Sequence, residues 1–175
     1  APISGVTALQ AVRKAQVQSG QSVLVTGAAG GVGTFAVQIA KASGAEVTGV
    51  CSTTKVDLVR SLGADHVIDY TSEESFGGQR RYDVILDIAG NAALADLRRA
   101  LSSRGRLVIV GGETGGRWLG GFDRPLRAVL LSPLVSQHLG MLSSTENARD
   151  LAALRELVES GDVTPIVDRS YPLSD

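Results

Sequence analysis

Val23-Leu-Val-Thr-Gly-Ala-Ala-Gly-Gly-Val-Gly33 is the stretch that decides the fold of this 175-residue chain. Residues 22–26 form a short apolar run, which is typical of a strand buried on both faces. Residues 27–33 form a glycine-rich turn, and residues 34–43 have the apolar spacing of a helix. Glycines let the backbone approach a ligand closely, and the amino end of a helix favours an anion. The stretch therefore predicts a phosphate-binding turn between a buried strand and a helix.

Three spacings of glycine fit this turn. The motif A-x-G-x-x-G at residues 28–33 is the dinucleotide pattern with alanine in the first place, and G-x-G-x-x-A at residues 31–36 matches literally but begins inside the expected helix. The motif T-G-x-x-x-G-x-G at residues 26–33 fits the short-chain dehydrogenases, which need a tyrosine followed by lysine four residues later. None of the three tyrosines has that lysine, so this alternative is disfavoured. A tight turn that binds no ligand remains the other alternative.

Outward from this stretch, strands and helices alternate along the chain. Strands are expected at residues 22–26, 46–50, 66–68, 83–87, 106–110 and 135–141. Helices are expected at residues 4–18, with Ser4 as the start signal, and at 34–43, 55–62, 92–101 and 145–159. Such alternation predicts an α/β fold of the Rossmann type, a doubly wound parallel sheet of about six strands with helices on both faces.

The composition fits one globular domain and argues against several classes of protein. Hydrophobic residues make up 43% and charged residues 20%, and the net charge is −1, so neither a disordered chain nor a basic nucleic-acid surface is indicated. The 21 glycines exceed the usual share of about 7% and predict many tight turns. Neither a transmembrane run nor a signal peptide is recognisable.

One cysteine and two histidines bound the chemistry further. With Cys51, His66 and His138 alone, a structural zinc site is not expected, and a single cysteine fits a reducing, cytoplasmic compartment. The chain begins at Ala1, so we expect a fragment or a processed piece. Residues 1–163 are interpreted as the domain that contains the glycine turn, and residues 164–175 as the start of a return to a second domain.

The end of the second expected strand predicts which cofactor would bind. An NAD site usually carries Asp or Glu there, to bind the ribose 2′-hydroxyl. Here the sequence reads Val50-Cys-Ser-Thr-Thr-Lys55, with no acid before Asp57. Hydroxyls and a lysine would attract a 2′-phosphate, so we expect NADPH, with Ser52, Thr53 and Lys55 at the phosphate. The alternative is that Lys55 is a solvated residue at a helix start.

Residues 22–70 resemble the cofactor domain of the medium-chain dehydrogenase/reductase superfamily, in its zinc-independent quinone oxidoreductase branch. The similarity lies in Ala-Ala-Gly-Gly-Val-Gly33, the Ser-Thr…Lys stretch and Leu62-Gly-Ala-Asp-His66. It continues through residues 83–90 and 105–112, and Gly-Val-Thr-Ala-Leu-Gln10 is similar to the family's segment before the first strand. Residues 113–134 do not align. Within them, residues 117–131 mix arginine with large apolar residues, and a loop and helix packed on this domain is the favoured interpretation; a cover over the substrate cleft, a membrane-surface contact and a dimer contact are the alternatives.

The resemblance implies roles for particular residues. The pyrophosphate would lie on the glycine turn, the 2′-phosphate near Ser52 and Lys55, the adenosine near Tyr70, the ribose near the turn after the fourth strand, and the nicotinamide near the turn after the fifth. The expected cofactor-binding residues are Thr7, Ala29, Gly30, Gly31, Val32, Ser52, Thr53, Lys55, Tyr70, Ala89, Gly90, Gly111 and Gly112.

The resemblance also implies an activity, namely hydride transfer from NADPH to a quinone or enone-like carbonyl compound. No catalytic residue is expected in this chain, because the substrate-contacting groups of the family belong largely to its other domain. The alternatives are a non-catalytic NADPH-binding sensor or accessory module and the reductase domain of a multienzyme synthase. The resemblance further implies a homodimer through the edge of the sixth strand, because members of the family often dimerise there.

Overall fold

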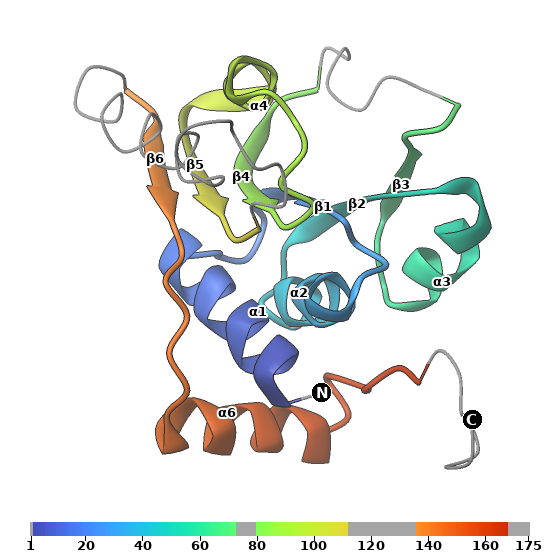
Figure 1. The fold of residues 1–175 in the computed structure, drawn as a ribbon, viewed down its shortest axis with the longest axis vertical. Helices are drawn as coiled ribbons and strands as arrows, with labels where there is room; N and C mark the ends of the chain where they lie inside the picture. The colour runs from blue at the N-terminus through green and yellow to red at the C-terminus, as the bar shows by residue number, and fades with distance from the viewer. Residues whose placement is uncertain (1, 73–79, 112–135, 168–175) are drawn as a thin grey trace, which may run out of the picture.

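The computed structural model describes residues 2–72, 80–111 and 136–167 of the chain. Its centre is a six-stranded parallel sheet with the strand order β3-β2-β1-β4-β5-β6. The chain builds outward from β1 to β3, then returns to the other side of β1 to continue with β4, so the order reverses between β1 and β4 (Figure 1). The strands are β1 Ser22–Thr26, β2 Glu46–Cys51, β3 His66–Asp69, β4 Tyr82–Asp87, β5 Leu101–Ile109 and β6 His138–Met141.

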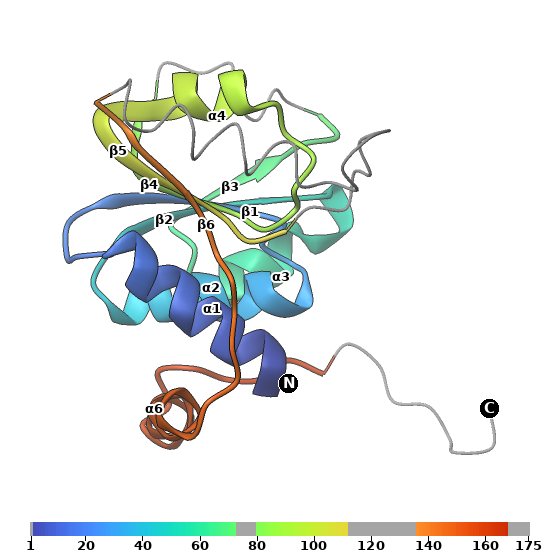
Figure 2. The ribbon, with the colours of Figure 1, turned by 60° about the vertical axis from the view of Figure 1, so that its left-hand side comes forward.

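Helices cover the sheet on both faces, which confirms the expected doubly wound α/β fold. Helices α1, α2, α3 and α6 lie on one side of the sheet and α4 lies on the other (Figure 2). The helices are α1 Pro2–Ala15, α2 Gly31–Ala42, α3 Val56–Ser61, α4 Leu94–Ala100 and α6 Ala148–Glu159, and a short 3-10 helix, η1 Thr53–Lys55, precedes α3.

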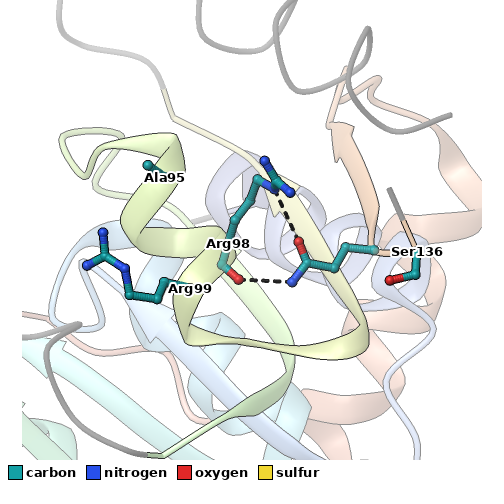
Figure 3. Close-up of a pocket in the computed structure, with 5 residues that line it drawn as sticks. Ala95, Arg98, Arg99 and Ser136 are labelled. Carbon is teal, nitrogen blue, oxygen red and sulfur yellow. Dashed lines mark hydrogen bonds between the residues drawn. The ribbon is translucent and has the colours of Figure 1, made fainter. Parts of the chain in front are cut away.

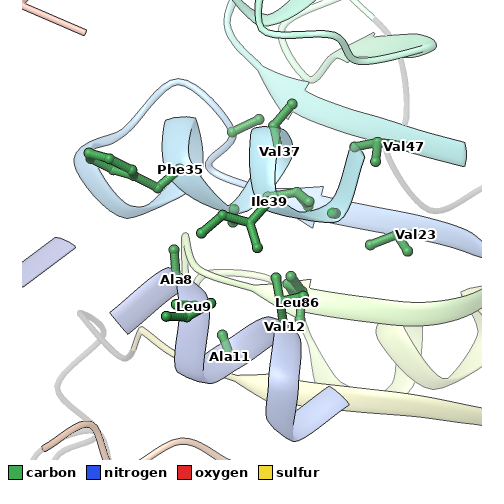
Figure 4. Close-up of a cluster of buried hydrophobic side chains, with 14 of the residues drawn as sticks. Ala8, Leu9, Ala11, Val12, Val23, Phe35, Val37, Ile39, Val47 and Leu86 are labelled. Carbon is green, nitrogen blue, oxygen red and sulfur yellow. The ribbon is translucent and has the colours of Figure 1, made fainter. Parts of the chain in front are cut away.

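The larger hydrophobic core lies between the sheet and the pair α1 and α2. Small and branched side chains of the two helices meet the strands there, and Ile39 of α2 and Leu9 of α1 are each almost fully buried (Figure 4). A second core on the opposite face packs Leu97 of α4 against Ile85 and Leu107. Strands with apolar side chains on both faces fit this arrangement, because helices remove both faces from water.

Several boundaries differ from those the sequence predicts. Helix α1 begins at Pro2, not Ser4, and ends at Ala15, because Gln16 takes a left-handed φ of 53°. Helix α2 begins three residues early, at Gly31, since glycine can adopt helical geometry as well as turn geometry. Strand β5 begins at Leu101 rather than residue 106, and β6 covers only His138–Met141 of the expected 135–141.

Helix α6 is attached to α1 through a buried carboxylate. Asp150 accepts hydrogen bonds from Gln10 Nε2 at 2.6 Å and Asn147 Nδ2 at 2.7 Å, and it forms an ion pair with Arg13. Asn147 also caps the helix, because its Oδ1 accepts from the Asp150 backbone N–H at 2.9 Å. These hydrogen bonds lower the pKa of Asp150, with Gln10 as the largest cause.

The last described residues are held by a side chain of α2. Gln38 is buried, and its amide donates to Thr164 O at 3.1 Å and accepts from Thr164 N–H at 2.7 Å. Its Nε2 also donates to Thr34 O at 2.9 Å. Val163, which is buried, donates its N–H to Leu157 O at 3.0 Å. The segment after α6 is therefore packed back onto α2 before it leaves this region.

Candidate functional site

A hollow of about 590 Å³ lies at the carboxyl ends of the strands. It lies where the strand order reverses between β1 and β4, which is the position where ligands bind in open α/β sheets. Its walls come from the glycine turn, from the end of β2 and from the segment after β4. The lining residues are Thr26, Gly27, Ala29, Gly30, Val50, Cys51, Ser52, Tyr70, Ile88, Ala89, Asn91 and Ala92.

The glycine turn forms one wall because two of its positions exclude side chains. Gly27 has a φ of 66°, and a Cβ there would lie 3.1 Å from Ala89 N. A Cβ on Gly33 would lie 2.0 Å from Gly27 O, so the start of α2 packs directly on the turn. A Cβ on Gly30 would meet only Gly27 O, at 3.3 Å, and Gly30 is exposed. The backbone at Gly30 therefore lines the hollow without a side chain over it.

The amino end of α2 adds a favourable field for an anion. Gly30 is its N-cap residue. Because glycine has no side chain, no side-chain hydrogen bond caps the first backbone N–H groups of the helix. Helix α2 has 12 residues, and its dipole places partial positive charge at this end. A glycine turn at the amino end of a helix is an arrangement that can hold a pyrophosphate.

Thr26 joins the ends of two strands beneath the hollow. Its Oγ1 donates to Asp87 Oδ1 at 2.8 Å and accepts from the backbone N–H groups of Ile88 at 3.0 Å and Ala89 at 3.2 Å. Thr26 and Asp87 are 3% and 0% exposed, so water cannot replace these bonds. The segment that follows β4 is thereby fixed against β1.

Asp87 extends the same connection to β5. Its carbonyl oxygen accepts from the N–H groups of Val110 at 2.9 Å and Gly111 at 3.3 Å. A Cβ on Gly111 would lie 2.1 Å from Ile88 O, so this glycine permits a close approach of the segments after β4 and β5. Three neighbouring strand ends are therefore held in one arrangement.

The rim at β2 and β3 carries hydroxyls and one carboxylate. Thr53 Oγ1 donates to Asp69 Oδ2 at 2.6 Å, and Thr71 donates to Asp69 Oδ1 from its N–H at 2.9 Å and from its hydroxyl at 2.7 Å. These hydrogen bonds, that of Thr53 first, lower the pKa of Asp69. Lys55 ends η1 beside this group, and Tyr70 is 59% exposed. The sequence did not predict an acid at this rim.

Five of the residues predicted from the sequence line the hollow, namely Ala29, Gly30, Ser52, Tyr70 and Ala89. Others adjoin it along the chain, where Gly31 and Val32 open α2, Thr53 and Lys55 lie in η1, and Gly90 follows Ala89 with a φ of 69°. Gly111 follows β5. Thr7 lies on α1 and does not line the hollow, and its hydroxyl is 3.2 Å from that of Ser144. Gly112 and residues 113–134 lie outside the described residues.

Several lining residues were not predicted. Thr26 is polar and ends the apolar strand β1, so polarity at a strand end was the available signal for it. Asn91 lies in the segment after β4, where no such signal exists. Cys51 lines the hollow but is 4% exposed, and burial raises the pKa of its thiol. A neutral, buried thiol packs as a small hydrophobe.

A second hollow, of about 500 Å³, lies between α4 and the start of β6 (Figure 3). Arg98, Arg99, Ala95, Ser136 and Gln137 line it. Arg98 Nε donates to Gln137 Oε1 at 3.2 Å, and Gln137 Nε2 donates to Arg98 O at 2.9 Å. These contacts attach the beginning of β6 to α4, away from the carboxyl ends of the strands.

The described residues bring together no set of side chains for a zinc ion. In residues 2–72, 80–111 and 136–167, no group of three or more His, Cys, Asp or Glu side chains could hold a metal. His66 is not isolated, since its Nε2 lies 2.9 Å from Glu46 Oε1.

None of the helices in the described part combines the length and apolar character of a membrane span.

Comparisons with known proteins identify the family of this chain. The family described as zinc-binding dehydrogenase matches residues 62–175. The chloroplast envelope quinone oxidoreductase homolog of Arabidopsis thaliana is 30% identical over 183 residues, covering 99% of this chain and 54% of the relative. The mitochondrial NAD(P)H oxidoreductase RTN4IP1 of Mus musculus is 34% identical over 193 residues, covering 99% and 49%.

The fold is also that of a solved enzyme. The structure of the quinone oxidoreductase from Coxiella burnetii superimposes with a TM-score of 0.79 at 26% identity, covering 95% of this chain and 50% of that one. The chain thus spans about half the length of the proteins it matches. With the strand order, the glycine turn and the family match together, the chain belongs to the zinc-binding dehydrogenase family of the medium-chain dehydrogenase/reductase superfamily.

Proposed function

We propose that this chain is the cofactor-binding half of an oxidoreductase that transfers hydride from NADPH to a quinone or enone-like carbonyl compound. The observation that carries the proposal is the hollow at the strand-order reversal, with the bare backbone of Gly30 and the uncapped end of α2 on its wall. The relatives named quinone oxidoreductase and NAD(P)H oxidoreductase support the same class of reaction. We place residues 1–163 in this half and residues 164–175 in the return to the other.

The proposed site divides the cofactor among three parts of the hollow. Ala29 and Gly30, with Gly31 and Val32 behind them, would hold the pyrophosphate through backbone N–H groups. Ala89 and Gly90 would lie by the ribose, and Gly111, with Gly112 and Thr7, would face the nicotinamide. NADPH supplies the hydride when bound, and the chain's residues orient the dinucleotide and exclude water from one side of it.

The adenosine end would decide the preference for NADPH. Ser52 lines the hollow, Thr53 and Lys55 follow it in η1, and Tyr70 presents an exposed ring beside them. A lysine cation favours a 2′-phosphate, which carries charge that the ribose hydroxyl of NADH lacks. We also propose that the reaction needs no zinc from this half, because the donor set does not fit the ion.

Nucleotide titration tests the cofactor assignment. In fluorescence titrations of this chain, Lys55→Ala should weaken NADPH binding about tenfold and change NADH binding less than about twofold. Lys14→Ala, an exposed lysine of α1, is the matched control and should change neither. Equal losses for both nucleotides in Lys55→Ala would contradict the assignment of Lys55.

Turnover separates an enzyme from a binding module. The full-length protein should oxidise NADPH in the presence of members of a quinone and enone panel, and a chelator should leave the rate unchanged. Binding of NADPH without oxidation by any acceptor would favour the alternative of a sensor or accessory module. A cytoplasmic location stays a prediction, since the relatives' names refer to the chloroplast envelope and the mitochondrion.

We further propose a homodimer through β6. It is one of the two edge strands of the described sheet. A second copy could extend the sheet by placing its own β6 against this edge. Sedimentation of the chain should give twice the monomer mass, and a clean monomer would argue against pairing through this edge.

A further inference from the structure

Asp69, the last residue of β3, brings a carboxylate to the rim of the proposed cofactor site, where the end of β2 has no acid. The parallel register places it opposite Cys51, the last residue of β2. Cys51 and Ser52 line the hollow, and so does Tyr70, whose N–H donates to Cys51 O at 3.1 Å. Asp69 is therefore opposite Cys51 in the sheet and next to Tyr70 in the chain, and both of these residues line the hollow.

The hydroxyls next to Asp69 are turned toward it. Thr53 and Thr71 both direct hydroxyl protons at its two oxygens, at 2.6 and 2.7 Å. The two hydroxyl oxygens are also 2.7 Å from each other. Each hydroxyl has one proton, so the two protons can serve only two of these three contacts, and both are held within the cluster. What Thr53 and Thr71 offer outward is lone pairs.

A rim of this kind discriminates by charge. A carboxylate and acceptor lone pairs favour a donor such as a ribose 2′-hydroxyl, and they repel a phosphate dianion. Lys55, in the adjoining η1, carries the opposite charge. The two groups act against each other on any 2′-phosphate, and the net preference depends on both.

We propose that Asp69 is a specificity-determining residue, which restrains the preference for NADPH that Ser52 and Lys55 favour and keeps NADH acceptable to the same site. This inference rests on the proposed function, because it assumes that a nicotinamide dinucleotide occupies the hollow. It also revises the part expected of Thr53, whose hydroxyl serves Asp69 and would not donate to the phosphate.

The test compares the two nucleotides on one variant. Asp69→Asn removes the charge and keeps one of the two acceptor oxygens that Thr53 and Thr71 contact. It should tighten NADPH binding about five- to tenfold, change NADH binding less than about twofold, and lose most of this gain in 0.5 M KCl, where exposed charges are screened. Asp57→Asn removes an equally negative, fully exposed side chain that faces Arg60, and should leave the ratio of the two affinities unchanged.

Each outcome decides one question. If both nucleotides bind the wild type and the ratio in Asp69→Asn stays within twofold of it, the inference is overturned and the proposed function stands. If neither nucleotide binds the wild type, the proposed function fails and the inference with it. Should Asp69→Asn not fold, Asp69→Ser, which keeps a short acceptor, carries the same expectation and the same contrary outcome.

Discussion

Gln38 and Thr164 pair as two strands would, since the side-chain amide of one meets the backbone N–H and carbonyl of the other at 2.7 and 3.1 Å. The glutamine lies on α2, 126 residues away in the chain, and it is buried. One side chain therefore determines where the polypeptide leaves α6 and crosses back over α2.

Gln38→Leu should destabilise the chain by about 2 kcal/mol, because three hydrogen bonds are lost and the Thr34 carbonyl is left without this partner. Urea unfolding measures the change, and the backbone amide of Thr164 should exchange faster with solvent. Gln18→Leu, at an exposed glutamine, should alter stability by less than about 0.5 kcal/mol. Equal effects of the two substitutions would refute the role given to the pairing.

Thr26→Val should cost about 2–4 kcal/mol of folding free energy, since a buried carboxylate loses a donor and two backbone N–H groups lose an acceptor. Thr26→Ser keeps the hydroxyl and should recover most of the loss. Thermal unfolding of the two variants checks the prediction. A serine variant as unstable as the valine variant would show that the methyl group, and not the hydroxyl, matters.

Gly33→Ala should prevent the turn from forming as observed, because the added Cβ would lie 2.0 Å from Gly27 O and 2.8 Å from Ala28. We expect a loss of about 3 kcal/mol or more, together with loss of nucleotide binding. Gly31→Ala is the matched control. Its Cβ meets only the movable side chain of Ser4, at 3.3 Å, so stability should change by less than about 1 kcal/mol. Indistinguishable unfolding curves for the two alanine variants would contradict the packing argument.

Asp150 makes stability depend on pH in the acid range. Its pKa is lowered in the folded chain, so it contributes stability above the ordinary carboxyl pKa of about 3.9 and loses that contribution as the pH falls below it. The free energy of unfolding of the wild type should therefore exceed that of Asp150→Asn at pH 7, and the gap should narrow below about pH 4. Gln10→Leu, which removes the largest cause of the lowered pKa, should weaken this pH dependence. A gap that stays constant from pH 7 to pH 3 would refute it.

The sheet was predictable from the sequence where a strand is buried on both faces. The bounds of β1 agree at both ends, because a continuous apolar run meets a glycine turn. Strand β5 was predicted too short, since Ser102, Ser103 and Arg104 are polar and extend the strand at the surface. Turns that end in glycine were clear, but the residue at which α2 begins was not, because glycine fits both turn and helix.

The site was predictable only in the part that is continuous in sequence. The glycine turn and Ser52 were found from local patterns, and both line the hollow. The bond between Thr26 and Asp87 joins residues 61 apart, and no local signal indicates it. An NAD site usually has an acid at the end of β2, and this chain has none there. Asp69 reaches the same rim from β3, because neighbouring parallel strands end side by side.

The hydrogen bonds that hold the segments after β4 and β5 to Thr26 and Asp87 have a consequence for the thermodynamics of binding. These segments and the two side chains, here called the floor of the hollow, are already ordered, so they lose little conformational freedom when a dinucleotide binds. The loss is the same for either dinucleotide. The floor would then contribute affinity common to both cofactors, while the exposed rim alone separates them. Substitutions at the rim and in the floor should therefore have additive effects, so cofactor preference could change in evolution without disturbing the folding of the core.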